Sequence, residues 1–237
     1  MIYAINVAPD VQACKGSDFD QVVSTSPTTV DGWNVTVVGA GTVTAGSAFG
    51  NSCGIVRLGT GTTTTGAGIL STSSNDLKLG NGIVAFKSNI QLPTLSDGSN
   101  TYAVRIGLNS ATDGTQGIDG VMFEYSSATA VAGGMGGNWR CLTVSGTTAT
   151  TINTGVAAYA VGTASNPLAT GLRFVVAPDR SRVDFYINGT AVGFSTTNIP
   201  TVSMSWCMSI LKSAGTTARN LDVDYEYRRF EFTTPRL

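Results

Sequence analysis

The chain has 237 residues, of which 42% are hydrophobic and only 12% are charged. Its formal net charge is −1, so it lacks the basic surface that attracts nucleic acids and anionic membranes. The sequence contains no histidine, which excludes His-based catalytic triads, His general bases and His-ligated metals.

The N-terminal segment predicts an arm, which we place at residues 1–16. Tyr3, Ile5 and Val7 alternate as in a short strand, and Pro9 ends it. A strand with free edges adds readily to a neighbouring sheet, so we expect this arm to contact another subunit. The segment lacks the basic and apolar regions of a secretory signal peptide, so we expect the chain in a cytoplasm or inside a virus particle released by lysis.

From residue 17 to residue 237, the sequence indicates a single all-β domain. Residues 82–92 and 102–108 alternate between apolar and other side chains, as half-buried strands do. No window has the 3.6-residue period of a capped helix, and no apolar run is long enough to cross a membrane. About twelve to fifteen strands, separated by turn signals, predict a jelly-roll β-sandwich of two large antiparallel sheets with almost no helix.

Residues 172–195 predict a three-stranded meander. Its turns are expected at Asp179–Arg180 and Asn188–Gly189, where the residue types favour tight hairpins. This register places five apolar residues on the inner face: Leu172, Phe174, Phe185, Val192 and Phe194. The outward side chains, which we expect to carry no cluster for chemistry, are Arg173, Asp184, Tyr186 and Ala191.

Five segments carry a resemblance to a known family: Arg105–Leu108, Asp119–Tyr125, Asn138–Val144, Leu172–Gly193 and Leu221–Phe232. In order and spacing they resemble the strands of the concanavalin A-like lectin/glucanase domain, as found in virion proteins of tailed bacteriophages such as tail fibres, adhesins and head decoration proteins. The resemblance covers residues 17–237 and implies a curved jelly roll.

The resemblance also implies a function. The chain is expected to be a non-enzymatic structural protein of a phage virion, decorating the head or tail surface, binding host-surface glycan, or both. Its expected partners are other virion proteins, further copies of itself in a homo-oligomer, and host glycan; nucleic acid and membrane insertion are not expected. Two alternatives remain: a free-standing glycan-binding module, and a glycoside hydrolase or lyase of the laminarinase-like type.

The hydrolase alternative rests on Asp222, Asp224 and Glu226. Alternate residues of a strand share a face, and retaining glycosidases use two carboxyl groups about 5 Å apart. In laminarinase-like enzymes the corresponding acids lie on a mid-chain strand and begin with Glu, whereas here they lie on the last strand. We therefore favour a plain strand, in which Leu221, Val223 and Tyr225 face the core and the acids face solvent. A later shift in the pattern indicates a bulge or a change of sheet near Arg228–Arg229.

Four residues are candidates for ligand binding. Trp139 and Tyr125 offer aromatic faces on which a sugar can stack, although a position in the core is the favoured explanation for each aromatic residue. Asp113 and Asp119 bound a glycine-rich loop that could hold a structural calcium ion. Turn chemistry explains the same loop, and we favour it, so no cofactor is expected.

Two further patterns favour structural explanations. The four cysteines, Cys14, Cys53, Cys141 and Cys207, form no CxxC pair, and we expect buried free thiols rather than disulfides. Residues 50–54 match the letters Gly-x-Ser-x-Gly. A nucleophile elbow needs a preceding strand, a following helix and a histidine, so Ser52 is expected to be a turn residue.

Overall fold

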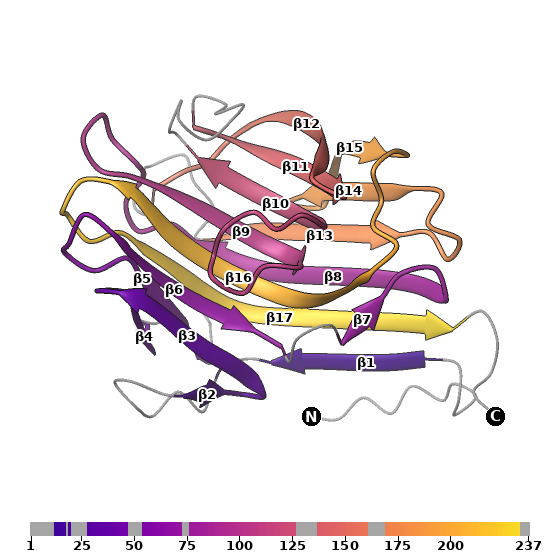
Figure 1. Ribbon diagram of the computed structural model, residues 1–237, viewed down its shortest axis with the longest axis horizontal. Coiled ribbons are helices and arrows are strands. Elements are labelled where there is room, and N and C mark those ends of the chain that lie inside the picture. The colour runs from indigo at the N-terminus through magenta and orange to yellow at the C-terminus, as the bar shows by residue number, and fades with distance from the viewer. Residues whose placement is uncertain are drawn as a thin grey trace.

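The computed structural model describes residues 12–17, 19, 28–46, 54–72, 76–126, 137–160 and 169–232. Within these ranges the chain forms seventeen strands and no helix. None of the described residues therefore belongs to a helix long and apolar enough to cross a membrane. The strands form two antiparallel sheets that face each other as a sandwich (Figure 1), which confirms the predicted all-β jelly-roll fold.

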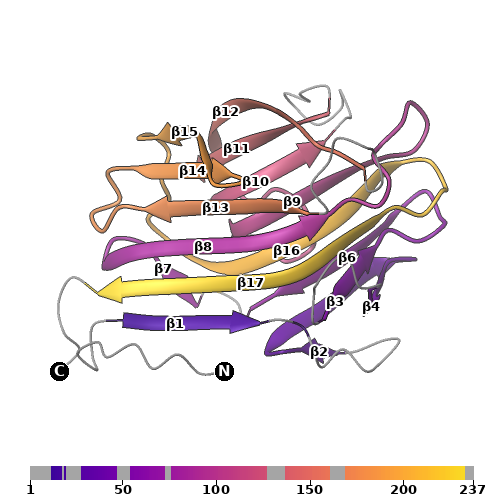
Figure 2. The same ribbon diagram turned by 180° about the vertical axis from the view of Figure 1, so that it is seen from behind.

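The first sheet, here called sheet A, faces the viewer in Figure 2. Its strands are hydrogen-bonded in the order β15-β14-β13-β8-β17-β5-β4, and β1 also pairs with β17. The bounds are β1 Gln12–Ser17, β4 Thr42–Ala45, β5 Val56–Gly59, β8 Gly82–Gln91, β13 Thr170–Val176, β14 Val183–Ile187, β15 Thr190–Ser195 and β17 Asn220–Phe232.

The second sheet, sheet B, lies in front in Figure 1. Its order is β12-β11-β10-β9-β16-β6-β3-β2, and β7 pairs with β16. The bounds are β2 Thr29–Val30, β3 Trp33–Gly39, β6 Gly66–Ser71, β7 Leu77–Lys78, β9 Thr101–Asn109, β10 Gly120–Ser126, β11 Asn138–Ser145, β12 Thr148–Ala157 and β16 Ser203–Ala214.

The core lies between the two sheets and is rich in aromatic rings. Phe86 of β8 and Phe174 of β13 stack with ring centroids 5.5 Å apart, and both stack on Trp206 of β16, at 5.4 and 6.2 Å. Burial alternates along β8 and β13: every second side chain packs against sheet B, and the others point outward. One face of sheet A is therefore left outside the sandwich.

The first hairpin of the meander has the predicted register. Leu172 pairs with Ile187, Phe174 with Phe185, and Val176 with Val183. Arg180 has a φ of 62°, and the backbone N–H of Ala177 donates to Arg182 across the turn at 2.8 Å. The pairing predicted for this hairpin is confirmed.

The second hairpin corrects the prediction at Phe194. Asn188 and Gly189 form the turn as expected, with φ values of 50° and 80°. The register then shifts at a bulge, so that Phe185 pairs with Gly193 and not with Val192. The bulge leaves Val192 packed against the core but turns Phe194 outward, where it is 52% exposed and stacks under the Arg182 guanidinium at 3.9 Å.

Strand β17 is bordered on one side by β8 and on the other by two short strands. Its first residues pair with β5, from Asn220 opposite Gly59 to Val223 opposite Val56. Its later residues pair with β1, from Glu226 opposite Ser17 to Glu231 opposite Gln12. The last residues of the predicted arm therefore form a strand of sheet A, while residues 1–11 lie outside the described part of the chain.

Candidate functional site

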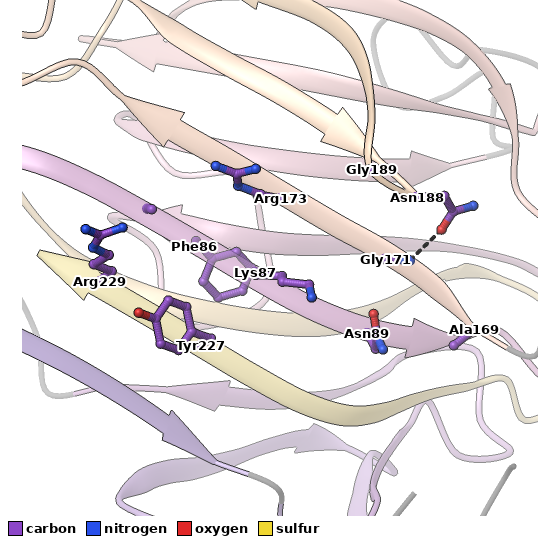
Figure 3. Close-up of a pocket in the computed structure, with 11 residues that line it drawn as sticks. Phe86, Lys87, Asn89, Ala169, Gly171, Arg173, Asn188, Gly189, Tyr227 and Arg229 are labelled. Carbon is purple, nitrogen blue, oxygen red and sulfur yellow. Dashed lines mark hydrogen bonds between the residues drawn. The ribbon is translucent and has the colours of Figure 1, made fainter. Parts of the chain in front are cut away.

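A hollow of about 520 Å³ lies on the outer face of sheet A. Strands β8, β13 and β17 form its floor, and the β14–β15 turn forms one end (Figure 3). Its eleven described lining residues are Ala85, Phe86, Lys87, Asn89, Ala169, Gly171, Arg173, Asn188, Gly189, Tyr227 and Arg229.

Small side chains open this hollow. Ala85, Gly171 and Gly189 leave space where larger residues of the outer face would stand. At the turn, the Asn188 side chain accepts a 2.7 Å hydrogen bond from the backbone N–H of Gly171 through Oδ1. This bond ties the β14–β15 turn to the start of β13 and fixes the amide of Asn188 at the edge of the hollow.

One row of side chains runs from strand to strand on the outer face of sheet A, and three of its four members line the hollow. Tyr186 on β14 pairs with Arg173 on β13, Arg173 pairs with Lys87 on β8, and Lys87 pairs with Tyr227 on β17. Neighbouring strands are about 4.8 Å apart, so this row spans about 14 Å. Tyr227 is 37% exposed.

The two cations of this row lie against aromatic rings. The Arg173 guanidinium stands 4.9 Å from the centroid of Tyr186, and the Lys87 ammonium 5.2 Å from that of Tyr225. Such contacts orient a cation without neutralising it. The third cation, Arg229, forms an ion pair with Glu231. Arginine, lysine, asparagine amides and a partly exposed tyrosine together suit a polar ligand with hydroxyl groups and a flat apolar face.

Trp139 and Tyr125, proposed as sugar platforms, lie in the core. Each is 1% exposed, and their ring centroids are 5.9 Å apart. The Tyr125 hydroxyl accepts a hydrogen bond from the backbone N–H of Ser96 at 3.1 Å. The structure does not support these two residues as a ligand-binding pair, because neither ring has a face open to solvent.

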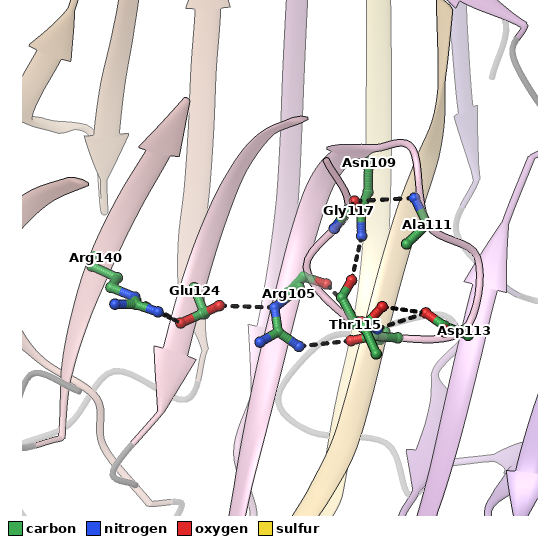
Figure 4. Close-up of polar contacts among 10 residues, drawn as sticks. Arg105, Asn109, Ala111, Asp113, Thr115, Gly117, Glu124 and Arg140 are labelled. Atoms are coloured by element: carbon green, nitrogen blue, oxygen red, sulfur yellow. Dashed lines mark hydrogen bonds and ion pairs between the residues drawn. The ribbon is translucent and has the colours of Figure 1, made fainter. Parts of the chain in front are cut away.

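The loop between Asp113 and Asp119 folds over the outer face of sheet B (Figure 4). Asp113 accepts hydrogen bonds from the backbone N–H and the hydroxyl of Thr115, at 2.9 and 2.6 Å. Burial opposes ionisation of Asp113, but these bonds keep its pKa below the usual value. Asp119 instead accepts from the backbone N–H of Gly146 at 3.2 Å. No group of three or more acidic or cysteine side chains suited to a metal occurs among the described residues.

Beneath this loop lies a buried charge network. Glu124 on β10 accepts hydrogen bonds from Arg105 Nε at 2.8 Å and from Arg140 Nε at 2.6 Å. Arg105 also donates to the carbonyl of Gly114 at 2.7 Å, which fastens the loop to the sheet. All three charged side chains are almost fully buried, so this network belongs to the scaffold.

Asp222 and Glu226 of β17 do not share a site. Asp222 forms a bidentate ion pair with Arg57, in which both N···O distances are 2.7 Å. Glu226 accepts two hydrogen bonds from Arg228, which itself stands over the Trp33 ring of the core at 4.6 Å. Both acids are 1% exposed, so the expectation that they face solvent is wrong.

The cause is a bulge in a different place from the predicted one. The register of β17 against β8 shifts between Val223 and Tyr225, not near Arg228–Arg229. Asp222 therefore lies on the outer face, opposite to Val223, while Glu226 turns toward the interior. The two carboxylates point to different sides of sheet A.

Two cysteines are described, and both are free. Cys141 and Cys207 are buried, and desolvation raises the pKa of both thiols, that of Cys207 to about 12. Both therefore match the expectation of buried thiols. Ser52 and Cys53 lie outside the described residues, as does the side chain of Cys14.

A comparison with known protein families shows the family to which the chain belongs. The model of the family described as SO2946-like, C-terminal domain, matches residues 51–224, which is most of the sequence. The chain belongs to the SO2946-like family. No curated protein sequence matches it.

Solved structures with the same fold include a protein of unknown function, SO2946 from Shewanella oneidensis MR-1. It superposes on the SO2946-like chain with a TM-score of 0.66 at 13% identity, covering 96% of this chain and 90% of that one. The carbohydrate recognition domain of Emp47p gives a TM-score of 0.54 at 10% identity, covering 96% and 100%. A carbohydrate esterase from the Shiga toxin-encoding bacteriophage phi24B gives 0.52 at 15% identity, covering 85% and 91%. At these identities the likeness shows a lectin-like jelly-roll fold.

The hollow of the SO2946-like chain was not predicted from the sequence. The outward side of the meander was expected to carry no cluster for chemistry, yet Arg173 lies there next to Lys87. The outward position of Lys87 was visible in the alternation of β8. What the sequence did not reveal was that β8 pairs with β13.

Proposed function

We propose that this SO2946-like chain is a saccharide-binding module that binds its ligand in the hollow of sheet A. The observation that carries the proposal is the row Tyr186–Arg173–Lys87–Tyr227, flanked by the amides of Asn89 and Asn188. Amides and cationic groups donate hydrogen bonds to hydroxyl oxygens, and a partly exposed tyrosine such as Tyr227 suits stacking against a sugar. The fold shared with the Emp47p carbohydrate recognition domain supports this proposal.

The test is binding of the isolated chain to a panel of immobilised polysaccharides and glycans. Replacing Ala85 with tryptophan fills the hollow, and we expect binding to fall about tenfold or more. Ala149→Trp is the matched control, because Ala149 is exposed on β12 of the other sheet. Equal binding by the two variants would contradict the proposal, as would the absence of any saccharide that binds.

We further propose that the chain is a non-enzymatic structural protein of a bacteriophage virion, decorating its head or tail and contacting host glycan. The shared fold with a phage protein and the low charge content support this. Purified bacteriophage particles should contain the chain in a fixed ratio to the other virion proteins, as measured by quantitative mass spectrometry. A saccharide incubated with the chain should release no new reducing ends. Absence from particles, or cleavage of the saccharide, would overturn the corresponding part of the proposal.

A further inference from the structure

An unusual pair of like charges lies at the centre of the hollow. Arg173 and Lys87 occupy directly opposite positions on β13 and β8, where side chains leave the sheet about 5 Å apart. Like charges in this arrangement repel each other and destabilise a sheet. A compensating group is therefore expected.

The described part of the chain does not supply this group. Seven of its nine arginines form ion pairs with a carboxylate: Arg57, Arg105, Arg140, Arg182, Arg219, Arg228 and Arg229. Arg173 forms no ion pair with any described residue, and neither does Lys87. Two acids of the neighbouring strands β14 and β17 already have arginine partners, since Asp184 pairs with Arg182 and Glu231 pairs with Arg229.

The surroundings keep both cations separate and available. Arg173 lies against Tyr186 on β14, and Lys87 lies against Tyr225 on β17, so each is drawn toward a different flanking strand. Figure 3 shows the head groups of Arg173, Lys87 and Arg229 spread around the hollow. None of its eleven described lining residues is acidic.

We propose that the hollow takes an acidic saccharide, whose anionic groups bind Arg173 and Lys87 while a sugar face stacks on Tyr227. This inference rests on the proposed saccharide-binding function and names its ligand class. A guanidinium binds a carboxylate or a sulfate through two parallel hydrogen bonds, and the ammonium adds a point charge. The amide of Asn89 and the NH2 group of Asn188 remain for the hydroxyl groups, since Asn188 Oδ1 already accepts from Gly171.

The test uses ligands that differ only in charge. Polygalacturonate is compared with its carboxyl-reduced form, and dextran sulfate with dextran, so that the two arms separate carboxylate from sulfate recognition. At moderate salt we expect at least one acidic polymer to bind about tenfold or more tightly than its neutral counterpart. Binding should weaken as salt is raised, because the charges are exposed and screened.

Substitutions then show which cationic residues bind the acidic polymer. Arg173→Gln and Lys87→Gln should each weaken acidic binding about tenfold. Arg182→Gln is the matched control, since it removes the same charge from an exposed arginine of the same meander, outside the hollow, and we expect less than about a twofold change. Thermal unfolding of each variant confirms that it is folded.

The outcomes separate the two proposals. If charged and neutral polymers bind equally, and Ala85→Trp alone abolishes binding, the acidic-ligand inference fails while the saccharide-binding function stands. If Arg182→Gln weakens binding as much as Arg173→Gln, the attraction is general to the surface and the inference is overturned. If no polymer and no glycan binds, both proposals fail.

Discussion

Replacing Phe174 with alanine is expected to lower the free energy of unfolding by about 3–5 kcal/mol, the usual cost of removing a buried aromatic ring. Phe174 has no exposed surface. Its ring centroid lies 5.5 Å from that of Phe86 and 6.2 Å from those of Phe185 and Trp206. The residue therefore contacts both sheets, and alanine would leave a cavity that neither sheet can fill without moving.

Urea unfolding followed by tryptophan fluorescence measures this effect as a lower midpoint with an unchanged slope. Phe194→Ala is the control, because it removes the same ring from the same sheet. It should cost about 1 kcal/mol or less, since Phe194 is 52% exposed and its ring stacks mainly under Arg182. A cost for Phe194→Ala equal to that for Phe174→Ala would place Phe194 in the core and refute the bulge at Val192.

Replacing Glu124 with glutamine is expected to cost about 3 kcal/mol or more, although the side chain keeps its size. The carboxylate is fully buried between Arg105 and Arg140. Without its charge, two guanidinium groups remain in a region that excludes water, and each loses a charge-assisted hydrogen bond. The loop held by Arg105 through the carbonyl of Gly114 should loosen at the same time.

Urea unfolding measures the stability change, and amide hydrogen exchange of residues 110–119 measures the loosening. Asp184→Asn is the comparison, because it removes a carboxylate from the exposed pair with Arg182, and it should change stability by less than about 1 kcal/mol. If Glu124→Gln were as mild as Asp184→Asn, the network would be solvated rather than buried.

Local signals in the sequence predicted the fold and much of the meander. The hairpin between Val176 and Val183 follows from its turn residues and from alternation, both of which lie within a dozen residues. The alternation of residue types no longer predicts which face a side chain occupies where a bulge adds a residue to one strand. At Val192 and near Asp224 the register shifts, and this reversed the predicted directions of Phe194 and Glu226. Tertiary packing decides such bulges.

The candidate site could not be predicted because it depends on pairing between distant segments. Lys87 and Arg173 are adjacent only because β8 pairs with β13 in sheet A, although strands of sheet B lie between them in the sequence. Trp139 and Tyr125 stood out by residue type, but type alone does not separate a ligand platform from a core ring. Small residues such as Ala85 and Gly171 gave no sequence signal, although they open the hollow.

The pairing of β1 with β17 also bears on how the chain can be shortened. The segment Gln12–Ser17 satisfies the backbone groups of β17 from Glu226 to Glu231. A truncated chain that starts after residue 17 would leave this stretch of β17 as an open edge with unpaired N–H and C=O groups. Such an edge is a template on which another molecule can add a strand, so removal of the N-terminal segment would favour self-association and aggregation of an otherwise intact domain.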